Sequence, residues 1–487
     1  MPFSPAFFVS VRRGLGEFGL QRESRRQAPD EIRRMRSIIS ITMIRNLPEE
    51  YLKRMKASLS EDYEAFLSCY ERPAEKALRF RPGRIREETR EKLIREWKLE
   101  AVPWCPDGYY YSEDIVRPGL SPYHDAGLFY IQEPSAMITA ASADILPIHL
   151  VLDLCAAPGG KSTQAAAAAG LLVSNEPIPA RARILSSNIE RMGFVNTVVT
   201  SAWPDELAGI LPEVFDRIIV DAPCSGEGMM RKDETAVEEW SEANVRQCVA
   251  RQEEILEAAS VMLRPGGKII YSTCTFEYDE NEGQIRSFLM RHPEYTLLGQ
   301  HTLYPHQVRG EGHFCAVLQK EGISCPGIQG FSEIVRKAKG KKGRSLSDGS
   351  LKPEDLGAFL KKQKIHVLRA GLEKGETKED RKGRNYYTPT HAEAMAKSYE
   401  SDPGAKLNIT DPDLCLRYLK GESLQLEDAD PAFGAAEEKN GSRGLGYVLS
   451  GPEGWLTVYY DGYPLGLGKR TGNTIKNHYP KGLRRLS

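Results

Sequence analysis

Residues 149–320 alternate short strand-like runs with helix-like segments, and this pattern constrains the fold more than any other feature. The strand-like runs, rich in Val and Ile, read HLVLDLCA, LLVSNE, TVVTSA, FDRIIVDAP and GKIIYSTC. The segments between them have helical composition, as in IPARARILSSNIERMG and NVRQCVARQEEILEAASVML. The alternation predicts an α/β fold, with a parallel sheet covered by helices on both faces. Because ligands of such sheets bind at the carboxyl ends of the strands, the loops that follow strands are the places to search for chemistry.

The chain has 487 residues, too many for one compact core. We expect residues 1–42, with eight Arg and little hydrophobic period, to be a disordered extension. A small α+β domain is expected at 43–115 and the parallel sheet at 116–322. Residues 323–388 read as a basic linker with a helical segment, and residues 389–487, where Gly and aromatic residues alternate, as a β-rich domain.

Composition excludes several classes of protein. No run of eighteen apolar residues exists, so no membrane span is predicted. Nine cysteines without a CxxC pair argue against a disulfide scaffold and against a zinc ribbon. We therefore expect a cytoplasmic protein without a metal site, and a monomer, because no feature predicts an obligate assembly.

Two segments are basic although the net charge is −1. Residues 336–384 hold 16 Lys/Arg against 7 Asp/Glu, and the last nineteen residues hold six basic residues and no acidic one. Such runs are often solvated faces, but they also suit a polyanionic partner such as RNA. Within LRFRPGR, residues 78–84, the side chains of Arg79, Arg81 and Arg84 are candidate phosphate contacts or solvated cations.

The first strand of the α/β region runs into DLCAAPGGKSTQ, residues 153–164. Glycines between a strand and a helix let a ligand approach backbone N–H groups. The loop lacks the first glycine of a Walker A motif, which disfavours an ATP phosphate loop. The second strand ends at Glu176, where an acidic residue typically binds ribose hydroxyls, although a surface carboxylate is the alternative. Together the loop and Glu176 predict an adenosine-containing cofactor.

Two cysteines follow strand ends on the ligand side. Cys224 lies between Pro223 and SGEG, and Cys274 lies between two threonines. A thiol that only fills a core would be flanked by Val or Ile, so these small polar surroundings predict ligand-facing turns. Cys155, inside the glycine loop, fits either a lining or a packing role. The other six are predicted to be structural: Cys69, Cys105, Cys248, Cys315, Cys325 and Cys415.

An adenosine cofactor beside strand-end thiols suggests methyl transfer to carbon 5 of a pyrimidine. A thiolate that adds to carbon 6 makes carbon 5 nucleophilic, able to take a methyl group from a sulfonium donor. The carbon 5 proton must then leave and the thiolate must be expelled, so a second thiol is a sensible assistant. On the residues alone, the roles of Cys224 and Cys274 are interchangeable.

The motifs DLCAAPGGKSTQ, NEP, DAPCSGEGMMRKD and YSTCTFEYDENE resemble the RsmF-like branch of the Sun/Fmu RNA cytosine-5 methyltransferases. IQEPSAM at 131–137, GEGHF at 310–314 and KNHYPKGLR near the end extend the resemblance over most of residues 43–487. The resemblance implies a Rossmann-like class I methyltransferase sheet, an N-terminal α+β RNA-binding domain and a C-terminal PUA-like RNA-binding domain. It implies S-adenosylmethionine-dependent methylation of cytosine carbon 5 in 16S ribosomal RNA, naked or in the small ribosomal subunit.

The resemblance also implies roles for single residues. Cys274 matches the nucleophile, Cys224 the cysteine associated with product release, Asp221 an acidic group near the target base, and Lys161 a cation facing the catalytic pocket. The implied cofactor contacts are Cys155, Ala156, Ala157, Pro158, Gly159, Gly160, Lys161, Glu176, Arg181 and Asp221. The sequence departs from the family pattern at the adenine-side position: the acidic residue that the family has shortly after the third strand comes here only at Asp205.

Three alternatives remain open at this point. Transfer RNA is a second possible substrate. A DNA cytosine-5 methyltransferase would use the cysteine after proline, Cys224, as nucleophile, but the chain lacks an obvious large DNA-recognition region. A non-catalytic ribosome-assembly factor is disfavoured because both cysteines and the full glycine loop are present.

Overall fold

A computed structural model describes residues 47–323, 327–331, 351–379, 383–426 and 446–485. The extension expected at 1–42 and part of the basic segment 336–384, namely residues 336–350 and 380–382, lie outside these residues. The described strands form an eight-, a six-, a four- and a two-stranded sheet. None of the described helices has both the length and the hydropathy needed to cross a bilayer.

The eight-stranded sheet has the order β10-β11-β9-β8-β5-β6-β7-β12. Its parallel centre, as predicted, consists of β5 (Leu150–Asp153), β6 (Leu171–Asn175), β7 (Thr197–Ser201), β8 (Phe215–Asp221) and β9 (Leu263–Thr273). Antiparallel strands close both edges: β10 (Tyr295–Leu303) and β11 (His313–Lys320) on one side, β12 (His366–Ala370) on the other. Strand β12 corrects the expectation that 323–388 is only a linker with a helix. It is added because its backbone pairs with β7, which would otherwise present an open edge.

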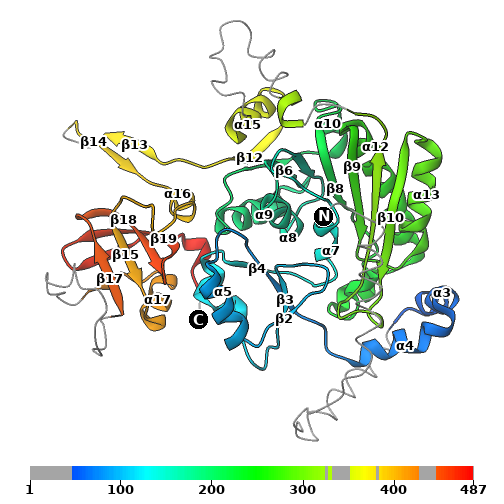
Figure 1. Cartoon of the computed structure of the whole chain (residues 1–487), viewed down its shortest axis with the longest axis horizontal. Helices are drawn as coiled ribbons and strands as arrows, with labels where there is room; N and C mark the ends of the chain where they lie inside the picture. Colours follow the sequence, from blue (N-terminus) through cyan, green and yellow to red (C-terminus); the bar gives the residue numbers. More distant parts are fainter. Residues whose placement is uncertain (1–46, 324–326, 332–350, 380–382, 427–445, 486–487) are drawn as a thin grey trace, which may run out of the picture.

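Helices cover both faces of this sheet (Figure 1). Along β5, Leu150 and Leu152 belong to one hydrophobic cluster and Val151 to another, because successive strand residues face opposite sides. One face packs on α10 (Pro204–Ala208), α12 (Glu242–Met262), α13 (Glu282–Arg291) and α15 (Pro353–Lys362). The other face packs on α7 (Met137–Ala141), α8 (Gly160–Ala166) and α9 (Pro179–Arg191).

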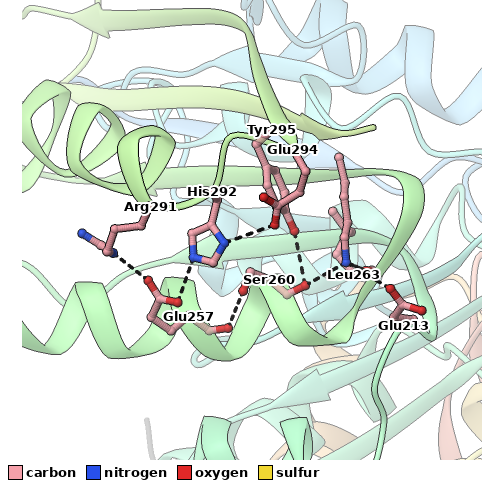
Figure 2. Close-up of polar contacts among 9 residues, drawn as sticks. Glu213, Glu257, Ser260, Leu263, Arg291, His292, Glu294 and Tyr295 are labelled. Atoms are coloured by element: carbon pink, nitrogen blue, oxygen red, sulfur yellow. Dashed lines mark hydrogen bonds and ion pairs between the residues drawn. The ribbon is translucent and has the colours of Figure 1, made fainter. Parts of the chain in front are cut away.

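Polar contacts fix α12 against α13 and β10 (Figure 2). Glu257 on α12 accepts a hydrogen bond from Arg291 Nε (3.0 Å), and its Oε2 lies 2.8 Å from His292 Nε2. The Tyr295 hydroxyl, at the start of β10, donates to the Ser260 carbonyl (3.3 Å). These residues lie near the amino end of β9, so the carboxyl ends of the strands stay free for a site.

The N-terminal region consists of a small sheet and of helices that pack beside the segments following β8 and β9. Helices α3 (Glu49–Leu59) and α4 (Tyr63–Leu67) share a cluster with Trp240 and Phe276. The four-stranded sheet has the order β2-β3-β1-β4, formed by Glu100–Ala101, Gly108–Tyr110, Ala77–Phe80 and Phe129–Ile131. Strand β4 lies beyond the boundary expected at 115/116 because it pairs antiparallel with β1. Helices α5 (Glu87–Glu96) and α6 (Pro122–Asp125) flank this sheet.

The C-terminal region is a six-stranded sheet, as its Gly/aromatic pattern suggested. Its order is β16-β20-β19-β18-β15-β17, formed by Leu424–Gln425, Thr474–Asn477, Tyr463–Thr471, Gly454–Tyr460, Lys406–Ile409 and Tyr447–Ser450. Helices α16 (His391–Met395) and α17 (Pro412–Leu419) accompany it, and β13 (Glu376–Glu379) pairs with β14 (Asn385–Thr388) before it. Its core is continuous with that of the N-terminal sheet, since Phe80 and Leu407 share one cluster. Figure 1 shows the two regions side by side, with α13 at the other end of the molecule.

Candidate active site

The glycine loop crosses the carboxyl ends of β5 and β6. Ala156 N donates to the Asn175 carbonyl (2.9 Å), and Gly159 has φ +116°, a left-handed conformation that favours glycine. Beneath the loop, Asp153 is fully buried and burial raises its pKa to about 7. Its Oδ2 accepts from Ser162, but Oδ1 has no hydrogen-bond partner among the described residues. An orphaned buried acceptor fits a ligand that brings a donor.

Glu176 and Arg181 lie where the sequence predicted cofactor contacts. Glu176 follows β6 and is 1% exposed, and its Oε1 accepts from Ile178 N (3.0 Å). Arg181 joins this carboxylate to the glycine loop, with Nη1 3.4 Å from Glu176 Oε2 and Nη2 donating to the Ala157 carbonyl (3.1 Å). The residues present thus fit an adenosine cofactor: a glycine loop, an orphaned acceptor, and a carboxylate one βα unit later that can bind hydroxyls.

Arg79 does not face solvent, contrary to its candidacy as a phosphate contact. It is 2% exposed, and its guanidinium donates to Gln132 Oε1 (3.0 Å), the Gly160 carbonyl (3.1 Å) and Thr163 Oγ1 (2.8 Å). Burial lowers its pKa only to about 10, so it remains charged. Arg79 therefore supports the glycine loop and the start of α8 from the neighbouring sheet.

Arg81 and Arg84 are also engaged with protein groups. Arg81 donates to the Met192 and Gly193 carbonyls after α9. Arg84 donates to the carbonyl of Ala126, after α6, and to that of Met395 in α16. Guanidinium groups at helix C-termini are favourable because the unpaired carbonyls there carry partial negative charge. This arrangement explains both arginines as connectors between regions.

Cys224 and Cys274 lie together, as their strand-end positions predicted. Their Sγ atoms are 3.3 Å apart, and both side chains are half-buried. The two loops run in parallel, because Ala222 N donates to the Ser272 carbonyl (2.9 Å) and Gly228 N to the Cys274 carbonyl (2.8 Å).

Five cysteines predicted to be structural are buried: Cys69, Cys105, Cys248, Cys315 and Cys415. Cys325 lies outside the described residues.

Cys155 lies between the core and the glycine loop. It is half-buried and packs against the large core cluster, and burial raises its pKa well above the ordinary thiol value. A thiol in such surroundings stays protonated at neutral pH.

Buried Lys161 and half-buried Asp221 form an ion pair beside the thiols. Lys161 Nζ lies 2.8 Å from Asp221 Oδ2. Burial alone would lower the pKa of Lys161, but the negative charge of Asp221 outweighs burial, so the pKa of Lys161 is raised. Burial alone would raise the pKa of Asp221, but the positive charge of Lys161 outweighs burial, so the pKa of Asp221 is lowered. Sequence reasoning missed two partners of this carboxylate. Ser272 Oγ donates to Asp221 Oδ1 (2.9 Å), and His313 Nε2 lies 3.6 Å from the same atom.

Ser272 lies in the motif YSTC and His313 in the motif GEGHF, and these two motifs are the sequence features from which both residues could have been found. Asp205, the delayed acid, lies in α10, directly after β7. At the carboxyl ends of β8 and β9 the protein thus gathers two thiols, an ammonium and a carboxylate. This set can supply a nucleophile, a proton acceptor and hydrogen bonds to a polar base.

Comparison with known proteins agrees with the geometry. Residues 147–319 match the family described as 16S rRNA methyltransferase RsmB/F, residues 47–134 the N-terminal domain of 16S rRNA methyltransferase RsmF, and residues 407–485 the methyltransferase RsmF PUA domain. The chain is 30% identical over 476 residues to ribosomal RNA small subunit methyltransferase F of Enterobacter sp. (strain 638), covering 90% of this chain and 95% of that protein. The chain belongs to the RsmF family.

Membership of the RsmF family confirms the resemblance seen in the motifs. The same-named protein of Aliivibrio fischeri (strain MJ11) is 31% identical over 495 residues, covering 90% of this chain and 97% of that protein. The crystal structure of NSun6 from Pyrococcus horikoshii with SFG aligns with a TM-score of 0.50 at 22% identity, over 57% of this chain and 99% of that one, and supports the fold. The protein is an S-adenosylmethionine-dependent RNA methyltransferase with a Rossmann-like sheet and a C-terminal PUA domain.

Proposed function

We propose that this protein methylates carbon 5 of a cytosine in 16S ribosomal RNA, with Cys274 as nucleophile. The observation that carries the proposal is the 3.3 Å separation of the Cys224 and Cys274 sulfurs beside the Lys161–Asp221 ion pair. Curated relatives named for the small-subunit ribosomal RNA support the choice of RNA. The proposal further holds that the protein works in the cytoplasm, as a monomer and without a metal.

S-adenosylmethionine, when bound, supplies a methyl group on a positively charged sulfur. The residues that would hold it are the loop 155–161 with Glu176, Arg181 and Asp221. Glu176 and Arg181 already contact each other and the loop, so the cradle is organised by the chain itself. Asp221, at the end of β8, pairs with Lys161 of the loop and precedes Cys224 by three residues.

The chain's own groups account for the covalent steps. The Cys274 thiolate bonds to carbon 6 of the cytosine, and the electron pair displaced from the C5–C6 double bond makes carbon 5 nucleophilic. After methylation, the proton on carbon 5 passes to water, its electron pair re-forms the C5–C6 double bond, and the Cys274–C6 bond breaks with its electron pair returning to the Cys274 sulfur. Cys224, 3.3 Å from the attacking sulfur, is placed to assist this release. The cytosine must be unpaired to enter, at a cost of about a few kcal/mol.

Two substitutions test the proposal. Cys274→Ala should abolish transfer of a labelled methyl group to 16S ribosomal RNA, whereas Cys224→Ala should accumulate a covalent protein–RNA adduct visible as a slow-migrating band. Cys248→Ala, which removes a buried thiol from α12, is the matched control and should retain activity. An active Cys274→Ala protein would contradict the assignment.

The same assay separates the alternatives. Labelling of transfer RNA in place of ribosomal RNA would move the substrate but keep the chemistry. Labelling of DNA, together with loss of the adduct in Cys224→Ala, would exchange the roles of the two cysteines.

A further inference from the structure

Glu280 is a fully buried carboxylate that the proposed chemistry does not use. It lies six residues after Cys274, in the short helix Tyr278–Glu280, and is 0% exposed. Its Oε2 accepts hydrogen bonds from Ser225 N (3.0 Å) and from Gln252 Nε2 (2.7 Å). Burial raises the pKa of Glu280, but these donors oppose the rise by stabilising the charged form.

Glu280 and Gln252 bracket one thiol of the pair and not the other. Gln252, fully buried on α12, also donates from Nε2 to the Pro223 carbonyl (2.9 Å). Pro223 and Ser225 are the two chain neighbours of Cys224, so the carboxylate and its amide partner hold the chain on both sides of that thiol. A negative charge is thereby fixed on the Cys224 side of the pair.

The positive charge lies on the other side. Lys161, paired with Asp221, interacts electrostatically with Cys274. The titratable groups that act on Cys224 are Cys274 and Glu280, and Tyr271 of β9 interacts with Cys224 and donates its hydroxyl to the Glu280 carbonyl (2.7 Å). The nearby thiol of Cys248 on α12 interacts with Glu280 and Cys274.

We propose that Glu280, oriented by Gln252, is a positioning residue that keeps Cys224 in its protonated form, which leaves Cys274 as the attacking thiol. A negative charge beside a thiol disfavours a second negative charge, whereas an ammonium favours one. The pKa of Cys224 is raised well above the ordinary value by its hydrogen bond to Cys274, by burial and by the charges of Cys274 and Glu280. The inference rests on the proposed function, because it explains why Cys274 rather than Cys224 is the nucleophile.

The test measures thiol reactivity, which needs neither RNA nor cofactor. In a Cys274→Ala background, Glu280→Gln keeps the size of the side chain and removes its charge. Alkylation of Cys224 by iodoacetamide, followed by peptide mass spectrometry from pH 6 to 9, should then be about 10-fold faster at pH 7.5, because one pKa unit changes the thiolate fraction about tenfold. Glu280→Asp keeps the charge and should leave the rate close to that of the background protein.

Glu282→Gln is the matched control, because Glu282 is a neighbouring, partly buried carboxylate that accepts from Thr302 and not from the thiol loops. An unchanged Cys224 rate in folded Glu280→Gln protein overturns the inference while leaving the proposed function intact. If Glu280→Gln does not fold, Gln252→Leu replaces it; loss of that donor favours neutral Glu280 and should also speed alkylation, and an unchanged rate overturns the inference. An active Cys274→Ala enzyme would instead overturn the proposed function, whatever the alkylation result.

Discussion

Arg79 donates a hydrogen bond from its guanidinium to the Gly160 carbonyl (3.1 Å), so a cation of the N-terminal sheet holds the first residue of α8. The glycine loop, residues 155–161, includes this residue. The N-terminal region and the cofactor loop are therefore joined through a buried polar contact, and not only through the chain that connects them.

Replacing Arg79 should act on stability and on the cofactor, not on RNA electrostatics. Arg79→Met leaves Gln132 Oε1 without its donor, and a buried orphan costs about 1–3 kcal/mol; the variant also takes from the Gly160 carbonyl one of its donors, the other being Thr163 Oγ1. We expect the free energy of unfolding to fall by roughly 3 kcal/mol and cofactor binding to weaken. Urea unfolding and calorimetry measure both effects. A fully stable variant with a smaller salt dependence of RNA binding would return Arg79 to the class of phosphate contacts.

Glu176→Gln should weaken cofactor binding by about 10- to 100-fold, because hydrogen bonds to a charged group contribute about 1.5–3 kcal/mol. The neutral amide also loses its ion pair with Arg181. Isothermal titration calorimetry with S-adenosylhomocysteine gives the affinity directly. Glu213→Gln, an exposed carboxylate paired with Lys320, serves as control and should bind normally.

The PUA domain presents a cross-strand row of Trp455, Lys469 and Lys476. Lys469 Nζ lies 5.8 Å from the centre of the Trp455 ring, and both lysines are exposed. If this row contacts two phosphates of single-stranded RNA, Lys469→Gln/Lys476→Gln should reduce the slope of log K against log salt by about 1.4. Filter binding at several salt concentrations measures it, with Lys53→Gln/Lys56→Gln on α3 as control. Equal slopes would mean that the row is only a solvated surface.

Acid should destabilise the C-terminal region through His391. Burial and the charge of Arg369 lower its pKa to about 4, below the ordinary value of about 6.5. Between these values the unfolded chain binds a proton that the folded chain does not, so stability is lost as pH falls below 6.5. Relative to wild type, His391→Phe should remove about 2 kcal/mol of the loss between pH 6.5 and 5. Denaturation curves of both proteins at pH 6.5 and pH 5 measure this loss in the free energy of unfolding. An equal loss in the two proteins would refute the prediction.

The central sheet was predictable because its strands are continuous apolar runs, which reflect burial on both faces. Strand β12, HVLRA, was not, since its burial comes from pairing with β7. This pairing joins two segments that are more than a hundred residues apart, and no local sequence pattern indicates it. The limit of the N-terminal region shifted for the same reason, as the pairing of β4 with β1 shows.

The site divides similarly. The glycine loop, the carboxylates and the two thiols could be predicted because each follows the end of a strand, and the strands are recognisable in the sequence. The 3.3 Å between the Cys224 and Cys274 sulfurs does not, nor does the burial of Arg79 within LRFRPGR, which has the composition of a solvated surface. His313 lay in a noted motif, but its approach to Asp221 depends on the antiparallel pairing of β11 with β9.

The contact between Tyr51 and Trp240, whose rings are 5.7 Å apart, has a consequence for synthesis on the ribosome. Helix α3 leaves the ribosome long before its partner exists, since 189 residues separate the two side chains in the sequence. At about 5–20 residues per second, its apolar face waits roughly 10–40 s for a surface to cover it. During that interval the helix is an exposed amphipathic segment, which makes this part of the nascent chain the natural place for a chaperone to bind.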